Sequence, residues 1–490
     1  MSISLIDRIM ETGSRNPAAP AFIHQDQVIT YNHLRAFLCV VAKMLHERGV
    51  RPGDVVGLAM AQSPLHCIAM LSLASLGAVS VPLSASLKIE DQLALIRRYG
   101  IHALVTDRDN IRISGVTVIR LNNITVSDKE SYSDSIYYRP DTETPIYVAL
   151  SSGTTGEPKG VLHTHGSLLD RIEKTLYCCD QTSRLIPPDL HVTVGLVFAV
   201  GILCCGGVVV FPRTYDLLDM VAAINLYAVT HILLSPAKAA QISSLLPKDG
   251  IAFPTLSHLR IVGSTPAEKL LVALREKFSQ HIYVPYGLTE LGVVSLATPE
   301  TLSMSPKSAG KLMPWARAEA IDKQGGVLPF GQSGEIRLSV EGMPKGYFCD
   351  SGRSEGKFRD GWFYPGDMGQ ISSAGLLTIE GRIDNILNIG GHKVTAEYVE
   401  DMLVRHPEVR EAVVFLFELD GEEILAAAII SDGNKIIQDI VEHCKRHLGV
   451  LAPEKFFFVR DFPRNAGGKL SRAEIPAMAS TMMDDKKLFD

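Results

Sequence analysis

The sequence predicts an α/β fold, with a large N-terminal domain of helix-covered sheets, a barrel-like antiparallel subdomain and a small mobile α+β C-terminal domain. At 490 residues, the chain exceeds the size at which one hydrophobic core stops growing. Helical stretches alternate with short β-branched runs from residue 30 to about residue 260, and this pattern changes twice further along. With 46% hydrophobic and 21% charged residues, the composition is that of a globular protein.

The N-terminal part has the pattern of parallel sheets covered by helices. Residues 1–15 are helix-like, and the short apolar runs that predict buried strands include Val55–Leu58, Ile146–Leu150 and His231–Leu234. Residues 315–380 instead show short strands at close spacing, for example Gly334–Leu338 and Gly361–Phe363. This spacing predicts the antiparallel or barrel-like sheet.

The pattern restarts after Arg382, where we place the domain boundary. It predicts a helix, two strands and a second helix, at Ala396–His406, Val409–Phe417, Ile424–Ile430 and Ile436–Leu448. We therefore expect an N-terminal domain over residues 1–381, a hinge at 382–385 and a C-terminal domain over 386–490.

Charge and cysteine usage argue against several classes of protein. The net charge of −6, with both signs mixed along the chain, offers no cationic surface for nucleic acid. The eight cysteines include the pairs Cys178-Cys179 and Cys204-Cys205, without CxxC spacing or a histidine at zinc-finger distance. We expect reduced, mostly buried thiols in a cytoplasmic protein.

Residues 192–211 carry no charge and are about long enough to cross a bilayer as a helix. Glycines interrupt this segment, and Val208–Phe211 before Pro212 has the pattern of a separate buried strand. The segment therefore predicts a core helix followed by a strand, and no membrane span. Asp7 and Glu11 stand where a signal peptide would have an apolar run.

The segment most specific for chemistry directly follows the strand that ends at Leu150. It reads Ser151-Ser152-Gly153-Thr154-Thr155-Gly156-Glu157-Pro158-Lys159-Gly160. Glycines let the backbone approach a phosphate chain, hydroxyls donate to its oxygens, and the lysine adds positive charge. A Gly/Ser-rich turn would explain the glycines but not the hydroxyls and lysine together, and the spacing is not that of a Walker A loop.

This segment resembles the signature loop of the adenylate-forming superfamily, which includes acyl-CoA synthetases, amino-acid adenylation domains and luciferases. Tyr286-Gly287-Leu288-Thr289-Glu290 resembles the superfamily's YGxTE motif. The resemblance implies that Tyr286 packs on adenine, Thr289 contacts phosphate and Glu290 helps to bind Mg²⁺. Gly287 belongs to the same ATP-binding segment.

Four further segments follow in the order of the superfamily. Tyr364-Pro365-Gly366-Asp367 implies a ribose contact for Asp367, and Gly381-Arg382-Ile383-Asp384 implies a nucleotide contact for Arg382 and a hinge at Asp384. The loop around Gly391 resembles the one that admits the pantetheine thiol. Lys469, in the segment from Pro463 to Leu470, resembles the adenylation lysine.

The resemblance implies an acid–thiol ligase that uses ATP and Mg²⁺, with catalytic roles for Lys469, Thr155, Glu290 and His191. The carboxylic acid is expected to lie beside residues 189–195, with His191 as an aromatic gate, although a histidine satisfied at a strand end is the alternative. The expected pocket residues are His191, Val192, Gly195, Ser264 and Leu288. Val192 stands where amino-acid-activating members have an aspartate, which favours an aryl or a short- to medium-chain acid.

The acceptor thiol remains open at this point, since coenzyme A and a carrier protein present the same pantetheine arm. A free-standing chain favours coenzyme A over a carrier protein. A non-catalytic acyl-nucleotide sensor is the alternative from another class, and the complete set of motif residues argues against it.

Overall fold

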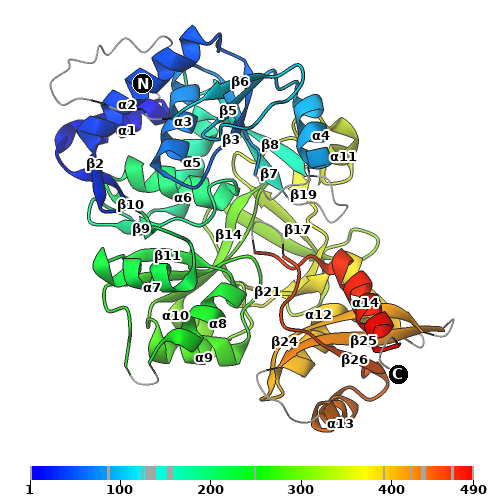
Figure 1. Ribbon diagram of the computed structural model, residues 1–490. Coiled ribbons are helices and arrows are strands. Elements are labelled where there is room, and N and C mark those ends of the chain that lie inside the picture. Colours follow the sequence, from blue (N-terminus) through cyan, green and yellow to red (C-terminus); the bar gives the residue numbers. More distant parts are fainter. Residues whose placement is uncertain are drawn as a thin grey trace. The chain divides into compact units, whose positions relative to one another are not determined.

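The computed structural model describes residues 3–84, 89–122, 124, 126, 140–151, 158–247, 250–389, 392–419, 422–431, 437–464 and 468–487. The chain forms two compact units (Figure 1). The first unit comprises Met1–Val262, Val272–Val294 and Val340–Asp360, and the second comprises Gly263–Leu271, Ser295–Ser339 and Gly361–Asp490. The expected boundary at residue 382 stays a prediction.

Two largely parallel sheets form the first unit. One has the order β2-β1-β10-β9-β11-β12-β13, in which only β1–β2 is antiparallel, with strands β1 (Pro20–His24), β2 (Gln27–Thr30), β9 (Arg184–Ile186), β10 (Val208–Phe211), β11 (His231–Leu234), β12 (His258–Ile261) and β13 (Ile282–Leu288). The other has the order β6-β5-β3-β4-β7-β8, with strands β3 (Val55–Ala59), β4 (Val79–Pro82), β5 (Ala103–Thr106), β6 (Thr117–Arg120), β7 (Pro145–Ser151) and β8 (Lys159–Thr164). The β7–β8 pair is antiparallel.

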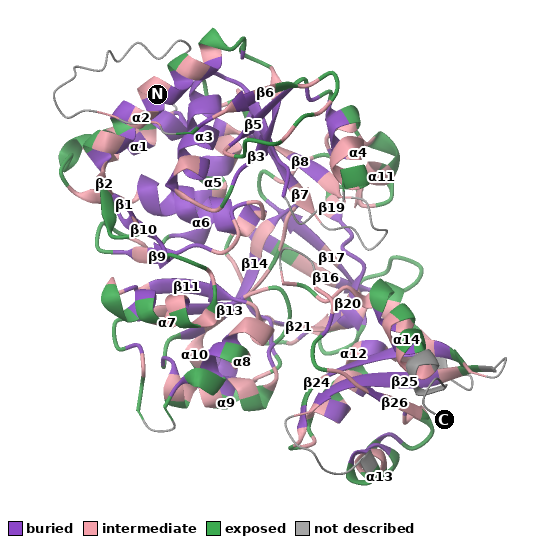
Figure 2. Ribbon diagram, in the orientation of Figure 1, coloured by how far each residue is buried: buried purple, intermediate pink, exposed green. Residues whose placement is uncertain are grey.

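Helices pack against both sheets of the first unit. The helices are α1 (Leu5–Arg15), α2 (Tyr31–Glu47), α3 (Pro64–Ser75), α4 (Ile89–Tyr99), α5 (His165–Thr175), α6 (Thr193–Cys204), α7 (Leu217–Leu226), α8 (Pro236–Leu245) and the short α11 (Ser351–Glu355), while α9 (Glu268–Lys277) begins in the second unit. Helices α1, α2, α3, α5 and α6 share one apolar core with both sheets of the first unit, and α4 packs in a second core beside β3, β4 and β5. Helices α3 and α6 are buried along almost their whole length (Figure 2), which explains why they are apolar on all sides. No helix in the described ranges combines the length and apolarity that crossing a bilayer requires.

The second unit contains the antiparallel sheet that the spacing predicted. Its strands are β14 (Gly292–Ala297), which starts in the first unit, β15 (Gly310–Leu312), β16 (Ala316–Ile321), β17 (Gly334–Val340), β19 (Trp362–Phe363), β20 (Asp367–Ile371) and β21 (Leu376–Arg382), with α10 (Pro299–Met304) between β14 and β15. The order runs β19-β17-β20-β21-β15-β14, and β16 pairs with β17. The two-residue strand β18 (Phe358–Arg359) precedes β19.

The last hundred residues of the second unit form a small α+β layer. After η1 (Ile383–Asn385), the elements are β22 (Ile386–Ile389), β23 (His392–Thr395), α12 (Ala396–Val404), β24 (Val409–Leu419), β25 (Glu422–Ser431), α13 (Ile437–Leu448), η2 (Gly449–Leu451), β26 (Lys455–Phe458), η3 (Arg472–Glu474) and α14 (Ile475–Lys487). Alternate side chains of β24 enter two cores. Val414 packs with α12 and α13, whereas Val413 and Phe415 pack with α14.

The structure confirms the predicted α/β class and the antiparallel segment, and residues 192–211 form helix α6 followed by strand β10. All eight cysteines are free, as expected. The expectation that most are buried is wrong, because only Cys67, Cys204 and Cys444 are fully buried and Cys349 is exposed. Adjacent cysteines carry no apolar periodicity from which their burial could be inferred.

Candidate active site

The predicted phosphate loop connects two antiparallel strands of the first unit. Ser151 ends β7, Lys159 begins β8, and the two residues face each other across the ladder. The hydroxyl of Ser151 donates to the carbonyl oxygen of Lys159 at 3.4 Å. Residues Ser152, Gly153, Thr154 and Thr155 lie outside the described ranges, so their roles stay predictions. The two strands fix the ends of the loop, with Lys159 at its C-terminal end.

Tyr286, Gly287 and Leu288 end strand β13, and Thr289 and Glu290 follow in the turn to β14. A Cβ atom on Gly287 would lie 2.7 Å from the carbonyl oxygen of the β14 residue Gly292, so the turn leaves no space for a side chain there. The segment predicted to bind the nucleotide is therefore a tight turn, and glycine stands where the backbone of β14 comes closest to it.

Lys159 and Glu290 both contact Tyr347, which the sequence did not reveal because no recognised motif contains it. The Lys159 Nζ lies 5.3 Å from the centre of the tyrosine ring, within cation–π range. The Tyr347 hydroxyl donates to Glu290 Oε1 at 2.7 Å, and both residues are buried. Burial raises the pKa of Tyr347, and the Glu290 carboxylate raises it further, so this tyrosine stays a neutral donor.

Glu290 has the chemistry of a magnesium ligand. Mg²⁺ binds oxygen donors and is commonly held by one or two carboxylates together with substrate phosphates. Hydrogen bonding from Tyr347 holds one oxygen of the Glu290 carboxylate in a fixed position. This donor set fits Mg²⁺ bound together with a nucleotide.

Arg171 on α5 is a second residue that the sequence did not single out, since one arginine in a helix of mixed charge carries no signal. Its Nη2 donates to the carbonyl oxygen of Thr289 at 2.8 Å. Burial lowers the pKa of Arg171 to about 10, although the charge of Glu290 opposes this shift. The guanidinium is therefore protonated at neutral pH and places positive charge at the turn that carries Glu290.

Asp189 holds His191 in one orientation. The Asp189 Oδ1 accepts both the backbone N–H of His191 and its ring Nδ1–H, at 2.9 and 2.8 Å. Burial alone would raise the pKa of Asp189, but the bonds from His191 outweigh it and the pKa is lowered. The ring of His66 contacts that of His191 edge-on at 4.8 Å, and burial lowers the pKa of His66 to about 3. The ring of His66 is therefore uncharged at neutral pH and lies beside His191.

The remaining predicted pocket residues lie in both units. Val192 is the N-cap of α6, and a Cβ atom on Gly195 would lie 2.1 Å from the carbonyl oxygen of Asp189. Gly195 therefore lets α6 pack against the turn that carries His191. Leu288 is half-buried in the first unit, whereas Ser264 is exposed in the second. The pocket assignment stays a prediction.

Asp367 and Arg382 form an ion pair in the second unit. They face each other across β20 and β21, with Arg382 Nη1 3.0 Å from Asp367 Oδ1. Arg382 also donates to the carbonyl oxygen of Pro365 at 3.0 Å and to Asp384 Oδ2 at 3.1 Å. Burial lowers the pKa of Arg382, but the two carboxylates outweigh it and the pKa is raised. The buried Asp367 carboxylate is an acceptor suited to ribose hydroxyls.

The predicted hinge residue Asp384 lies in the 3₁₀ turn η1. Next to it, Asn385 Nδ2 donates to Glu397 Oε1 at 2.6 Å. Gly381 precedes the turn with a φ of +153°, and a Cβ atom there would lie 2.6 Å from Glu397 Oε2. Glu397 of α12 therefore holds the hinge segment closely, while the thiol-loop candidate Gly391 lies outside the described ranges.

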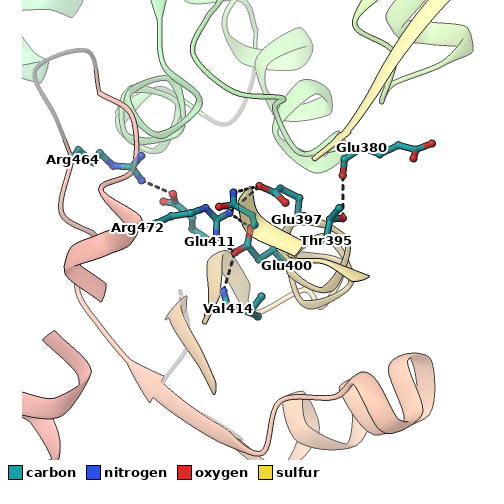
Figure 3. A network of polar contacts seen from close by, with 9 residues as sticks. Glu380, Thr395, Glu397, Glu400, Glu411, Val414, Arg464 and Arg472 are labelled. Atoms are coloured by element: carbon teal, nitrogen blue, oxygen red, sulfur yellow. Dashed lines mark hydrogen bonds and ion pairs between the residues drawn. The ribbon is translucent and has the colours of Figure 1, made fainter. Parts of the chain in front are cut away.

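Ion pairs anchor the segment that carries Lys469 on both sides (Figure 3). Before the lysine, Arg464 pairs with Glu411 of β24 and donates to the carbonyl oxygen of Gly468 at 3.2 Å. After it, Arg472 makes a bidentate pair with Glu400 of α12, with both bonds at 2.6 Å. Arg472 also lies 3.6 Å from Glu397, the residue that holds the hinge segment.

Within the second unit, the stem of Lys469 lies beside Gly263. A Cβ atom built on Gly263 would be 3.9 Å from Lys469 Cγ. Gly263 has a φ of +98°, a conformation that favours glycine, and begins the Gly-Ser-Thr-Pro run. The second unit therefore brings Lys469 close to the start of this glycine-led run.

Comparison with known proteins identifies two family models that match this chain. The family model described as "AMP-binding enzyme" matches residues 9–348, and "AMP-binding enzyme C-terminal domain" matches residues 398–469. A 4-coumarate–CoA ligase-like protein of Oryza sativa is 28% identical over 93% of this chain and 89% of its own length. A 4-chlorobenzoate–CoA ligase of an Arthrobacter species is also 28% identical, over 94% of this chain and 92% of its own length.

A solved structure shares the fold. The o-succinylbenzoate coenzyme A synthetase of Bacillus subtilis, in complex with ATP and magnesium ion, superimposes with a TM-score of 0.83 and 25% identity, over 95% of this chain and 98% of that chain. The chain belongs to the AMP-binding enzyme family of the adenylate-forming superfamily.

Proposed function

We propose that this enzyme uses ATP to convert a carboxylic acid into its acyl-adenylate, with release of pyrophosphate, and then transfers the acyl group to the thiol of coenzyme A. The placement of Lys469 carries this proposal. Its segment is anchored on both sides by ion pairs, and its stem lies beside Gly263. Family membership supports the reaction class.

In the first half-reaction, the substrate carboxylate attacks the α-phosphate, and negative charge grows on the phosphate oxygens. Lys469 supplies positive charge to the reacting phosphate, and the hydroxyls of Thr154, Thr155 and Thr289 donate to the phosphate chain. Mg²⁺ held by Glu290 would neutralise phosphate charge. Asp367 accepts the ribose hydroxyls, and its ion pair with Arg382 holds the carboxylate in position.

The acid is proposed to be an aryl or a short- to medium-chain acid rather than an α-amino acid. Val192 offers no carboxylate to a substrate ammonium group, and neutral His66 lies behind the proposed gate, His191. The relatives named for 4-chlorobenzoate and o-succinylbenzoate act on aryl acids, which supports the aryl class.

Coenzyme A is the proposed acceptor because the 4-chlorobenzoate relative and the solved synthetase are both named for transfer to it. Loading of a separate carrier protein is the second candidate, since both acceptors present the same pantetheine arm.

ATP–pyrophosphate exchange over a panel of aryl, fatty, short-chain and amino acids tests the first half-reaction. Exchange with an aryl acid supports the proposal, and detection of acyl-CoA by mass after adding coenzyme A establishes the acceptor. Exchange without acyl-CoA favours the carrier protein. Nucleotide binding without exchange for any acid contradicts the proposal and favours a non-catalytic sensor.

Asp384 is proposed as the hinge between the half-reactions, so Asp384→Pro is expected to retain adenylation and lose acyl-CoA formation by more than about tenfold. Proline fixes φ and restricts the residue before it, which hinders a hinge rotation. Both half-reactions are measured separately, by pyrophosphate exchange and by acyl-CoA formation from preformed adenylate. Asp384→Ala is the control, because it removes the bond to Arg382 without restricting the backbone. Equal losses in both half-reactions for the proline variant would contradict a hinge role.

Tyr347→Phe is expected to slow adenylation about tenfold, because a hydrogen bond to a charged group contributes about 1.5–3 kcal/mol. The change removes the donor to Glu290 but keeps the ring under Lys159. Exchange rates are measured across a range of Mg²⁺ concentrations, with the exposed Tyr177→Phe as the matched control. An unchanged rate and Mg²⁺ dependence would show that Tyr347 does not position Glu290.

A further inference from the structure

Two cysteines and two histidines gather in the first unit, and none of them is among the residues assigned to catalysis. Ligand atoms of Cys178, His231 and His258 all lie within 4.8 Å of one another. The sulfur of Cys179 lies 3.4 Å from His231 Nε2. Thiolate sulfur and imidazole nitrogen are the donors that structural zinc sites use.

Strand register brings the two histidines together. Strands β11 and β12 are parallel, and His231 pairs directly with His258, so both side chains lie on one face. Their rings stack with centres 4.5 Å apart and an angle of 4° between their planes. The two cysteines follow α5 and precede β9, the other neighbour of β11. The ligands therefore come from three segments far apart in sequence.

Hydrogen bonding indicates which nitrogen of each imidazole is available. The hydroxyl of Thr230 donates to the carbonyl oxygen of Arg184 and lies 2.7 Å from His231 Nδ1. The hydroxyl of Ser257 likewise donates to the carbonyl oxygen of Thr230 and lies 3.1 Å from His258 Nδ1. When each hydroxyl donates to its carbonyl oxygen, it accepts an Nδ1–H from the neighbouring imidazole, and Nε2 of that ring then carries a lone pair.

A hydrogen bond of this kind, from the non-ligating nitrogen to a nearby acceptor, orients histidines in metal sites. Here it is present twice, each time with the hydroxyl of the preceding residue. Two adjacent imidazole lone pairs need an electrophilic partner, which can be either a thiol proton or a metal ion.

The positive charge of Arg260 has two opposite effects on metal binding by the cluster. Its Nη2 lies 3.4 Å from the sulfur of Cys178, so its charge favours the thiolate that a metal requires. The same charge opposes a second cation. Cys179 offers a second sulfur atom beside His231.

We propose that Cys178, Cys179, His231 and His258 bind one Zn²⁺ ion. Bond lengths of about 2.3 Å to sulfur and 2.0–2.1 Å to nitrogen place tetrahedral ligand atoms about 3.3–3.8 Å apart. The ligand atoms of Cys178, His231 and His258, which lie within 4.8 Å of one another, would need to approach by roughly 1 Å to reach that geometry, and Cys179 would complete the set from its place beside His231. His231 is buried, whereas the other three residues are partly exposed and give the ion access. The ion would fix the segment that follows α5, the helix that carries Arg171.

Cobalt(II) is a suitable probe, because thiolate ligation gives a charge-transfer absorption that oxygen ligands do not give. The full-length protein is treated with a chelator under reducing conditions and titrated with Co²⁺ and then with Zn²⁺. One equivalent of Co²⁺ per chain is expected to give the thiolate band, and Zn²⁺ is expected to abolish it. The melting temperature is expected to rise when Zn²⁺ is added.

Cys178→Ser is expected to abolish the band, and His258→Asn to weaken metal binding by at least 100-fold. Ser257→Ala keeps every ligand and removes one supporting hydroxyl, so it is expected to weaken binding about 10- to 100-fold. Cys349→Ser and His281→Asn, both at exposed positions, are matched controls that are expected to bind like the unaltered protein.

Circular dichroism shows whether each variant is folded. If the unaltered protein gives no thiolate band, or if Cys178→Ser gives the same band, the proposal is wrong. The cluster is then a metal-free network in which thiol protons satisfy the two imidazoles. The metal-binding test does not measure ATP–pyrophosphate exchange. Its outcome is therefore independent of the proposed function.

Discussion

Lys469→Ala is expected to slow acyl-adenylate formation roughly 100- to 1000-fold, the loss typical when a preorganised charge-stabilising group is removed. In the proposed mechanism, the lysine ammonium supplies charge to the α-phosphate only while the carboxylate attacks it. ATP binding is expected to change much less, because Asp367, Arg382 and the Tyr286–Glu290 turn are unaltered. The measurements are ATP–pyrophosphate exchange and the affinity for ATP.

The same variant should still convert preformed acyl-adenylate and coenzyme A into acyl-CoA at close to the unaltered rate. Lys445→Ala is the matched control, since Lys445 is exposed on α13 and distant in sequence from the anchored segment. Loss of both half-reactions by Lys469→Ala, in a protein shown to be folded, would contradict a role restricted to adenylation. Unchanged exchange would remove Lys469 from the proposed mechanism.

Much of the fold could be predicted because its signals are local. The run Val208–Phe211 is a strand, and the uncharged stretch before it is a core helix because residues on all its sides are buried. The composition of the two compact units could not be predicted in this way. Residues 263–271 belong to the second unit although they precede β13 of the first, and such an assignment depends on contacts between distant segments.

The residues of the candidate site likewise fall into those that the sequence reveals and those that it does not. Motif residues such as Glu290, Asp367 and Lys469 could be named from the sequence because the superfamily places them in recognisable segments. Tyr347 and Arg171 could not, because their contacts are with segments distant in sequence and neither has a local pattern. The metal-ligating cluster was missed for a related reason, since strand pairing rather than sequence spacing brings its histidines together.

Arg472→Ala is expected to destabilise the second unit by about 3 kcal/mol, at the lower end of the range for breaking a buried ion pair, because this pair is only partly buried. The change leaves the Glu400 carboxylate without its bidentate partner. Burial raises the pKa of Glu400 even in the intact protein, although Arg472 and the backbone N–H of Val414 oppose this shift. Adenylation is expected to fall about tenfold or more, because the segment after Lys469 loses its anchor to α12. Thermal unfolding and pyrophosphate exchange measure the two effects.

The double variant Arg472→Met with Glu400→Gln separates stability from positioning. Glutamine keeps an acceptor for the N–H of Val414, and no unpaired charge remains, so the stability should return to within about 1 kcal/mol of the unaltered protein. Exchange should remain slow, because the bidentate contact that anchors the segment is still absent. Recovery of both stability and exchange would mean that Arg472 only stabilises the fold. Recovery of stability alone would show that the anchor holds Lys469 in position for adenylation.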